Sequence, residues 1–335
     1  MHFSFLKSID YFYSQLKHRI MFTDSLEVLD NIRLNFNQES LFLLNITLAF
    51  VMFGVALELK LERFKKVFLQ PKSAIIGIIS QFFLLPILTL GLVILINPSP
   101  SIALGMILVS ACPGGNISNF MTSLAKGNTE LSVSLTAVAD FSALVMTPFN
   151  FAFWGSVYAS IYSKGSGLII PIEIDPFEMF KTMIILLGIP LTIGMLFSYK
   201  FPKITSKIIK PIKIASIVIF ALYVIIALSM NWKYFLKYVH LIFLIVLIHN
   251  ALALTTGFTF AKIFKLSQND IRTITIETGI QNSGLALVLI FNPKLFNGVG
   301  GMAFIAALWG VWHILSGLGI AAYWSRKPLR KTTNN

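Results

Sequence analysis

One stretch of this sequence governs the interpretation of the others: Ile276-Glu277-Thr278-Gly279-Ile280-Gln281-Asn282-Ser283-Gly284. It lies between apolar runs, yet its nine residues include one carboxylate, two side-chain amides, two hydroxyls and two glycines. Polar groups at the depth of a lipid bilayer are energetically expensive, so a cluster of this kind indicates a functional site. We therefore predict a membrane-spanning helix that is broken at Gly279.

A second polar stretch lies far upstream, again inside an apolar segment: Cys112-Pro113-Gly114-Gly115-Asn116-Ile117-Ser118-Asn119. Its Pro-Gly-Gly sequence cannot continue a regular helix, because proline lacks a backbone donor and glycine is a poor helix former. Two interrupted apolar segments in corresponding positions of two halves are typical of the binding site of a secondary transporter.

The composition indicates a membrane protein. Of the 335 residues, 56% are hydrophobic and 12% are charged, against about 25% charged residues in soluble proteins. The net charge of +13 comes from lysines and arginines in short segments between apolar runs, so it predicts membrane orientation rather than binding to nucleic acid. One cysteine, Cys112, excludes an internal disulfide and a multi-cysteine metal site.

The predicted fold is an all-α polytopic membrane protein with about nine transmembrane helices. The expected spans cover residues 40–58, 73–96, 101–125, 130–154, 178–199, 211–231, 237–261, 271–291 and 301–324. Residues 1–38 contain no apolar window of about 20 residues. They are expected to form an N-terminal tail, either interfacial or disordered, unless Met21 is the true start.

Basic residues concentrate in every second connection, at 59–72, 200–213 and 262–272, and in the C-terminal tail 326–335. The positive-inside rule places these segments in the cytoplasm. The N-terminus is therefore predicted outside and the C-terminus inside, with the protein in the cell inner (plasma) membrane.

The spans also form two matching halves within a transporter domain at 39–325. Ser80-Gln81 in the second span matches His249-Asn250 in the seventh, and the two broken spans match each other. The first repeat covers about 40–154, a connector helix about 178–199, and the second repeat about 211–324. The repeats start from opposite sides, so they are inverted, and the substrate site is expected where the broken helices meet.

Two sets of oxygen ligands suit a hard monovalent cation such as Na⁺, because together they contain a single carboxylate. Ser132 and Thr136 are spaced four residues apart, so their hydroxyls share one helical face. The first set comprises Ser118, Asn119, Ser132, Thr136 and Glu277, and the second Gln81, Gln281 and the carbonyls of Thr278 and Ile280. Hydroxyls in membrane helices often bond only to their own helix, whereas an unpaired Glu277 would cost several kcal/mol.

These motifs together resemble the bile acid:sodium symporter family. The resemblance rests on the two broken-helix motifs, on Lys126-Gly127-Asn128, on Leu131-Ser132 with Thr136, and on Gln81-Phe82 with Pro86. It extends from about residue 45 to 324. It implies a core domain with crossed broken helices, a panel domain, and sodium-driven uptake of an organic anion.

The resemblance assigns the two oxygen sets to sodium and places the substrate near Asn116, Asn282 and His313. That substrate is a bile acid or a smaller carboxylate such as pantoate or a 2-oxo acid. No catalytic residue and no obligatory protein partner are expected. Three departures leave the substrate open: Asn116 after the glycine pair, Ile314 after His313, and Asp140, an extra carboxylate four residues beyond Thr136.

Three alternatives remain at this stage. Proton coupling through Glu277 or Asp140 would use the same fold without sodium. A carrier for a metalloid oxyanion would use a reactive thiol, and Cys112 adjoins the first break. An intramembrane enzyme is disfavoured, since the sequence lacks a histidine-rich metal set and a nucleophile paired with a base.

Overall fold

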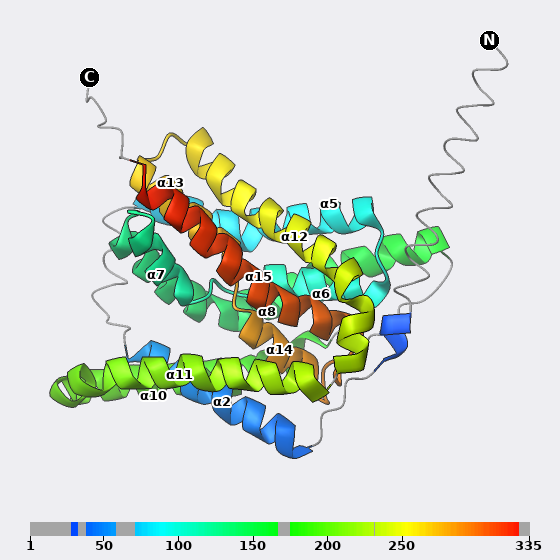
Figure 1. Cartoon of the computed structure of the whole chain (residues 1–335), viewed down its shortest axis with the longest axis horizontal. Coiled ribbons are helices and arrows are strands. Elements are labelled where there is room, and N and C mark those ends of the chain that lie inside the picture. Colours follow the sequence, from blue (N-terminus) through cyan, green and yellow to red (C-terminus); the bar gives the residue numbers. More distant parts are fainter. Residues whose placement is uncertain (1–27, 33–37, 58–70, 167–174, 231, 328–335) are drawn as a thin grey trace, which may run out of the picture.

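The computed structural model describes residues 28–32, 38–57, 71–166, 175–230 and 232–327, and all regular elements within these ranges are helices (Figure 1). A helix lies over each of the nine predicted apolar segments. In the first half these are α2 (Gln38–Ala56), α4 (Pro71–Ile79), α5 (Leu85–Ile96), α6 (Pro100–Ala111), α7 (Ile117–Leu124) and α8 (Thr129–Ser166).

The second half has the same kind of elements. The connector comprises α9 (Pro176–Met183) and α10 (Ile189–Lys200), followed by α11 (Pro202–Met230) and α12 (Trp232–Ile263). The second predicted break separates α13 (Gln268–Gly279) from α14 (Ser283–Phe291), and α15 (Gly300–Ser325) is the last helix. Both broken segments are therefore present where the sequence predicted them.

Two short π-helical turns interrupt otherwise continuous helices, η1 (Ser80–Leu84) and η2 (Ile184–Gly188). Each ends just before a proline, Pro86 in α5 and Pro190 in α10. Proline removes a backbone donor and its ring crowds the preceding turn, which widens the helix locally. At η1 the Leu85 amide accordingly reaches back to the Ser80 carbonyl.

Five helices or helix pairs are long and apolar enough to cross a membrane: Pro71–Ile96, Thr129–Tyr162, Pro176–Lys200, Ile242–Ile263 and Gly300–Ser325. The chain is therefore a multi-pass membrane protein. Nine crossings and the division into core and panel remain predictions.

Two helices extend beyond the predicted segments. Helix α8 continues past residue 154 to Ser166, through Pro148. The basic segment 200–213 is not a loop, because α11 begins at Pro202 directly after the end of α10. Proline is well tolerated in the first turn of a helix and lysine is a good helix former, so a basic segment need not be irregular. The basic segment 59–72 falls largely outside the described residues.

The helices form two groups (Figure 1). Helices α2, α10 and α11 pack against one another along one side of the molecule. Helices α12, α13 and α15 lie together on the other side, and α6 is fully buried between α5, α8 and α15. The main hydrophobic core lies around α6, α14 and α15.

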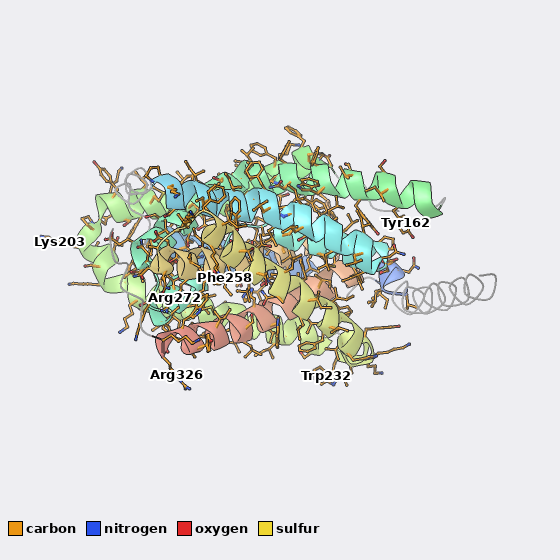
Figure 2. The ribbon with its side chains drawn as sticks, turned by 90° about the horizontal axis from the view of Figure 1, so that it is seen from above. Tyr162, Lys203, Trp232, Phe258, Arg272 and Arg326 are labelled. Atoms are coloured by element: carbon orange, nitrogen blue, oxygen red, sulfur yellow. The ribbon has the colours of Figure 1, made fainter. Side chains whose placement is uncertain are left out.

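Basic residues gather at one end of the helices. Lys203, Arg272 and Arg326 lie at one end of the molecule, whereas Tyr162 and Trp232 lie at the opposite end (Figure 2). The asymmetry is incomplete, since Lys233 follows Trp232 at the start of α12.

Residues 28–32, which belong to the predicted N-terminal tail, contact the helices. Leu29 is fully buried, and the Asp30 carboxylate accepts a hydrogen bond of 2.8 Å from the Ser101 amide in the first turn of α6. The Ile32 carbonyl accepts another, of 2.9 Å, from Gly300 at the start of α15. Residues 1–27 and 33–37 lie outside the described part.

Substituting Gly257 is expected to separate two closely packed helices. A Cβ at Gly257 in α12 would lie 2.7 Å from the Ile274 carbonyl oxygen and 2.8 Å from the Thr275 Cα, so the α13 backbone would have to move. Gly257→Ala should destabilise the protein by about 1–3 kcal/mol, measured as a lower melting temperature in detergent. The control is Gly91→Ala, where the new Cβ has nothing within 4 Å; an equal loss in both variants would contradict this packing.

Candidate functional site: a buried oxygen cluster at two crossed helix breaks

The two helix breaks lie against each other. The Gly115 amide donates a 2.7 Å hydrogen bond to the Ile280 carbonyl, and the Asn282 amide donates one of 2.8 Å to the Pro113 carbonyl. Gly114 and Gln281 form an isolated antiparallel bridge between them. Backbone groups freed by a break must find partners at membrane depth, and here each break supplies partners for the other.

Close approach at this crossing leaves little room for a side chain at position 114. A Cβ there would lie 3.2 Å from the Gln81 side-chain amide and 3.2 Å from Glu277 Oε2. The first predicted oxygen set and the second therefore meet at the same backbone position.

Glu277, in the last turn of α13, is buried and surrounded by hydroxyls from the other half of the chain. Ser118 Oγ donates to Glu277 Oε1 at 2.7 Å, and Ser132 Oγ donates to the same oxygen. Thr136 Oγ1 donates to Oε2 at 3.2 Å. The Asn119 amide oxygen completes the group, 2.9 Å from Ser132 Oγ and 3.3 Å from Thr136 Oγ1. All five residues of the first set are thus in one cluster.

The cluster contains more oxygen acceptors than protons. Ser132 has one hydroxyl proton but lies within hydrogen-bond distance of Glu277, Asn119 and Thr122. The unused lone pairs of such a cluster are what a hard cation coordinates. Among the described residues no group of three or more His, Cys, Asp or Glu side chains could hold a metal. With one carboxylate and otherwise neutral oxygens, the donor set fits Na⁺ better than a transition metal or a dehydrated divalent ion.

The second set surrounds the crossing itself. The Gln281 side-chain nitrogen donates a 2.8 Å hydrogen bond to the Thr278 carbonyl, and the Ile280 carbonyl accepts from Gly115. Each carbonyl keeps a second lone pair. In the described part of the chain, the buried Gln281 Oε1 and Gln81 Nε2 have no hydrogen-bond partner. The set is neutral, all its members are close to Gly114 or its partner Gln281, and it has free polar atoms.

Two of the three residues predicted to contact substrate, Asn116 and Asn282, lie at the crossing, and His313 lies on α15, which packs on α7 and α14. Asn116 precedes α7 and is half-buried, while Asn282 caps α14 by accepting a 3.0 Å bond from the Leu285 amide. His313 on α15 is 95% buried, and its Nδ1 lacks a partner among the described residues. Their role in substrate binding stays a prediction.

Some residues that support the site were not predicted as part of it. Asn250 donates a 2.8 Å hydrogen bond to the carbonyl of Gly279 and accepts one of 2.6 Å from Ser316. Ser80 and Thr278 share a hydrogen bond of 2.9 Å. The sequence indicated these positions only through the polar pair on each matching span, Ser80-Gln81 and His249-Asn250. His249 itself contacts Thr89 and Trp309, as expected of a buried structural histidine.

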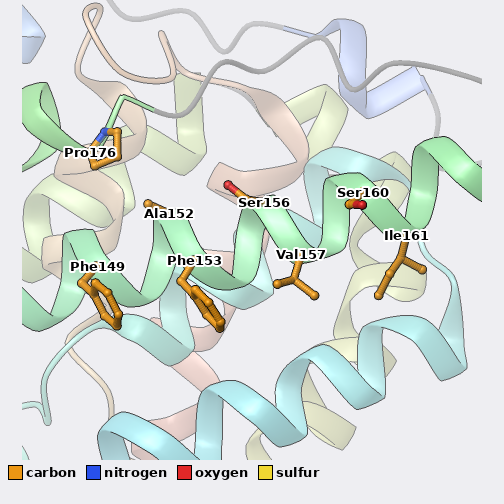
Figure 3. Close-up of a pocket in the computed structure, with 8 residues that line it drawn as sticks. All are labelled: Phe149, Ala152, Phe153, Ser156, Val157, Ser160, Ile161 and Pro176. Carbon is orange, nitrogen blue, oxygen red and sulfur yellow. The ribbon is translucent and has the colours of Figure 1, made fainter.

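The surface hollows lie elsewhere. One is an apolar groove on α8, lined by Phe149, Phe153, Val157 and Ile161, with Pro176 as a further lining residue (Figure 3). A second lies between Asn45, Lys181 and Asn292. Neither contains a residue of the two oxygen sets, which are enclosed within the helices.

Apolar helices with two crossed breaks and a buried oxygen cluster at the crossing are typical of one class of protein, the membrane transporters. Comparison with known sequences identifies the family. Residues 45–238 match the Sodium Bile acid symporter family, and the chain belongs to it. It is accordingly a transporter and not an enzyme.

Relatives from distant organisms are also named as sodium-dependent transporters or cotransporters. The chain is 33% identical over 291 residues to the uncharacterized sodium-dependent transporter YocS of Bacillus subtilis, covering 86% of this chain and 84% of YocS. It is 28% identical over 261 residues to the human ileal sodium/bile acid cotransporter, covering 76% and 72% of the two chains. A match at 28% to the probable sodium/metabolite cotransporter BASS2, chloroplastic, of rice covers 86% of this chain and 65% of the rice protein.

Proposed function

We propose that this protein is a sodium-coupled symporter for an organic anion. One observation carries the proposal: the carboxylate of Glu277 from one half of the chain is enclosed by Ser118, Ser132 and Thr136 from the other. A sodium ion in this cluster would neutralise Glu277 and join the two broken helices. The names of the relatives support sodium as the coupling ion.

The substrate is proposed to bind beside the cations. Helices α7 and α14 both begin at the crossing, and the positive ends of their dipoles favour an anion, whereas the carbonyl ends of α6 and α13 favour a cation. Asn116 and Asn282 lie at these helix starts, and His313 lies on α15, which packs on both helices. These three residues would hold the carboxylate of a bile acid, pantoate or a 2-oxo acid. Sodium and substrate then raise each other's affinity, and this coupling is reciprocal.

Transport is proposed to proceed by alternating access. The mutual packing of α2, α10 and α11 supports a panel that is distinct from the helices of the crossing. The basic end of the molecule supports a cytoplasmic C-terminus and an outside N-terminus in the plasma membrane. The repeats would be 40–154 and 211–324, joined by the connector 178–199 and flanked by the tails 1–38 and 326–335.

The metalloid alternative is disfavoured by the cysteine. Cys112 is fully buried, whereas a reactive thiol needs solvent access.

Uptake into proteoliposomes tests the proposal. The protein is reconstituted with an inward sodium gradient and offered radiolabelled taurocholate, pantoate or a 2-oxo acid. We expect accumulation of at least one of these anions with sodium but not with potassium. Accumulation that follows an imposed pH gradient and ignores sodium would establish proton coupling instead.

A further inference from the structure

Asp140 is a carboxylate that neither oxygen set contains. It lies in α8 and is fully buried, in a helix that is long and apolar enough to cross the membrane. Neither of its oxygens has a hydrogen-bond partner in the described residues. A buried ionised group is stable only when it is paired or hydrogen-bonded, so Asp140 lacks a partner that the charge requires.

Its position extends the face of α8 that contacts Glu277. Ser132, Thr136 and Asp140 follow one another at intervals of four residues, which places all three on one side of the helix. Asp140 therefore lies one turn, about 6 Å, beyond Thr136. Thr136, one turn before Asp140, donates a hydrogen bond to Glu277, so two carboxylates lie in this region of the protein.

The basic side chains on the neighbouring helices do not form hydrogen bonds with Asp140. Three basic residues occur on the described helices that pack most extensively on α8. Arg272 donates to the Ala125 and Trp324 carbonyls, and Lys181 forms an ion pair with Glu178. Lys72 is in the first turn of α4, where it is exposed to solvent. None of these three side chains bonds to Asp140, and a bound cation would compensate its charge.

Protonation alone would not satisfy the group. Protonation would remove the charge but create a buried O–H donor that needs an acceptor, whereas a sodium ion contacts carboxylate oxygens and brings water ligands of its own. Thr136 Oγ1 faces Glu277 and keeps a lone pair for a second cation. The neighbours of Asp140 three residues away, Ala137 and Ala143, are small.

We propose that Asp140 binds an additional sodium ion, beyond the two oxygen sets, next to Thr136 on the face of α8 that contacts Glu277. This inference rests on the proposed function and extends it. It makes Asp140 a third cation site, and it predicts that one more positive charge moves in each cycle than the two sets alone would carry.

Counting bound sodium tests this proposal. Equilibrium binding of ²²Na⁺ to the detergent-purified full chain is measured at saturation for the wild type and Asp140→Asn. We expect the variant to bind one ion fewer per chain while it retains the ions that depend on Glu277. Asp140→Thr has a neutral side chain of different shape and should show the same loss. It keeps the test possible if Asp140→Asn does not fold.

The matched control is Ser134→Ala, because the Ser134 hydroxyl bonds only to the carbonyl of Glu130 on its own helix, at 2.7 Å. It should bind as many ions as the wild type. An unchanged count in both Asp140 variants would overturn the third site, including the case in which Asp140 takes up only a proton. A wild type that binds no sodium at all would instead overturn the proposed function.

Discussion

Glu277→Gln is expected to weaken sodium binding by at least about 100-fold, or ~2.7 kcal/mol. The substitution keeps the shape of the side chain but removes the negative charge of the first set. It also places an amide NH₂ among the hydroxyls of Ser118, Ser132 and Thr136, which now donate to the carboxylate. Removing one partner of a buried charge pair costs about 2–5 kcal/mol or more. Sodium titration of the melting temperature measures the change.

The same substitution at an exposed glutamate is the control. Glu130 lies in the first turn of α8 and is exposed, so Glu130→Gln should leave the sodium response intact. Sodium affinity within threefold of the wild type in Glu277→Gln would show that this carboxylate is not a ligand.

Gly114→Val is expected to abolish sodium binding at both sets together. The new Cβ would lie 3.2 Å from the Gln81 side-chain amide, 3.2 Å from Glu277 Oε2 and 3.4 Å from the Glu277 carbonyl oxygen. The two additional methyl groups would then displace these atoms or separate the breaks. We expect at least about a 100-fold loss of sodium affinity, equivalent to ~2.7 kcal/mol, in a protein that still elutes as a single species from a sizing column.

Gly319→Val is its counterpart, since a Cβ at Gly319 in α15 has nothing within 4 Å. It tests whether a loss of sodium affinity arises from placing valine in a helix or from disturbing the crossing of the two breaks. Equal sodium affinity in the two variants would mean that the close approach at Gly114 does not shape the cation sites.

The sequence predicted the breaks well because their signals are local. Pro113, Gly114 and Gly279 interrupt apolar runs, and Glu277 marks a polar group at membrane depth. The structure places the breaks together, with Gly115 bonded to Ile280. The grouping of the hydroxyls around Glu277 also followed from chemistry, because a lone buried carboxylate needs donors.

Contacts between distant segments could not be predicted in the same way. Asn250 supports the Gly279 carbonyl, and Ser80 bonds to Thr278 across 198 positions of sequence. No local pattern tells which polar side chain on one helix will face a break on another. Helix ends failed for a different reason: hydropathy marks where apolar residues stop, whereas α11 begins with the lysine-rich turns after Pro202, where the backbone is already helical.

Thermal stability of the detergent-purified protein, titrated with sodium chloride against potassium chloride at constant ionic strength, is the most direct test. A ligand that binds only the folded state stabilises it, by about 2.7 kcal/mol at 100 times its dissociation constant. The melting temperature is predicted to rise with sodium but not with potassium in the wild type, and in Glu277→Gln the rise should require at least about 100-fold more sodium. Identical melting curves in the two salts would contradict a sodium site at the crossing of the broken helices.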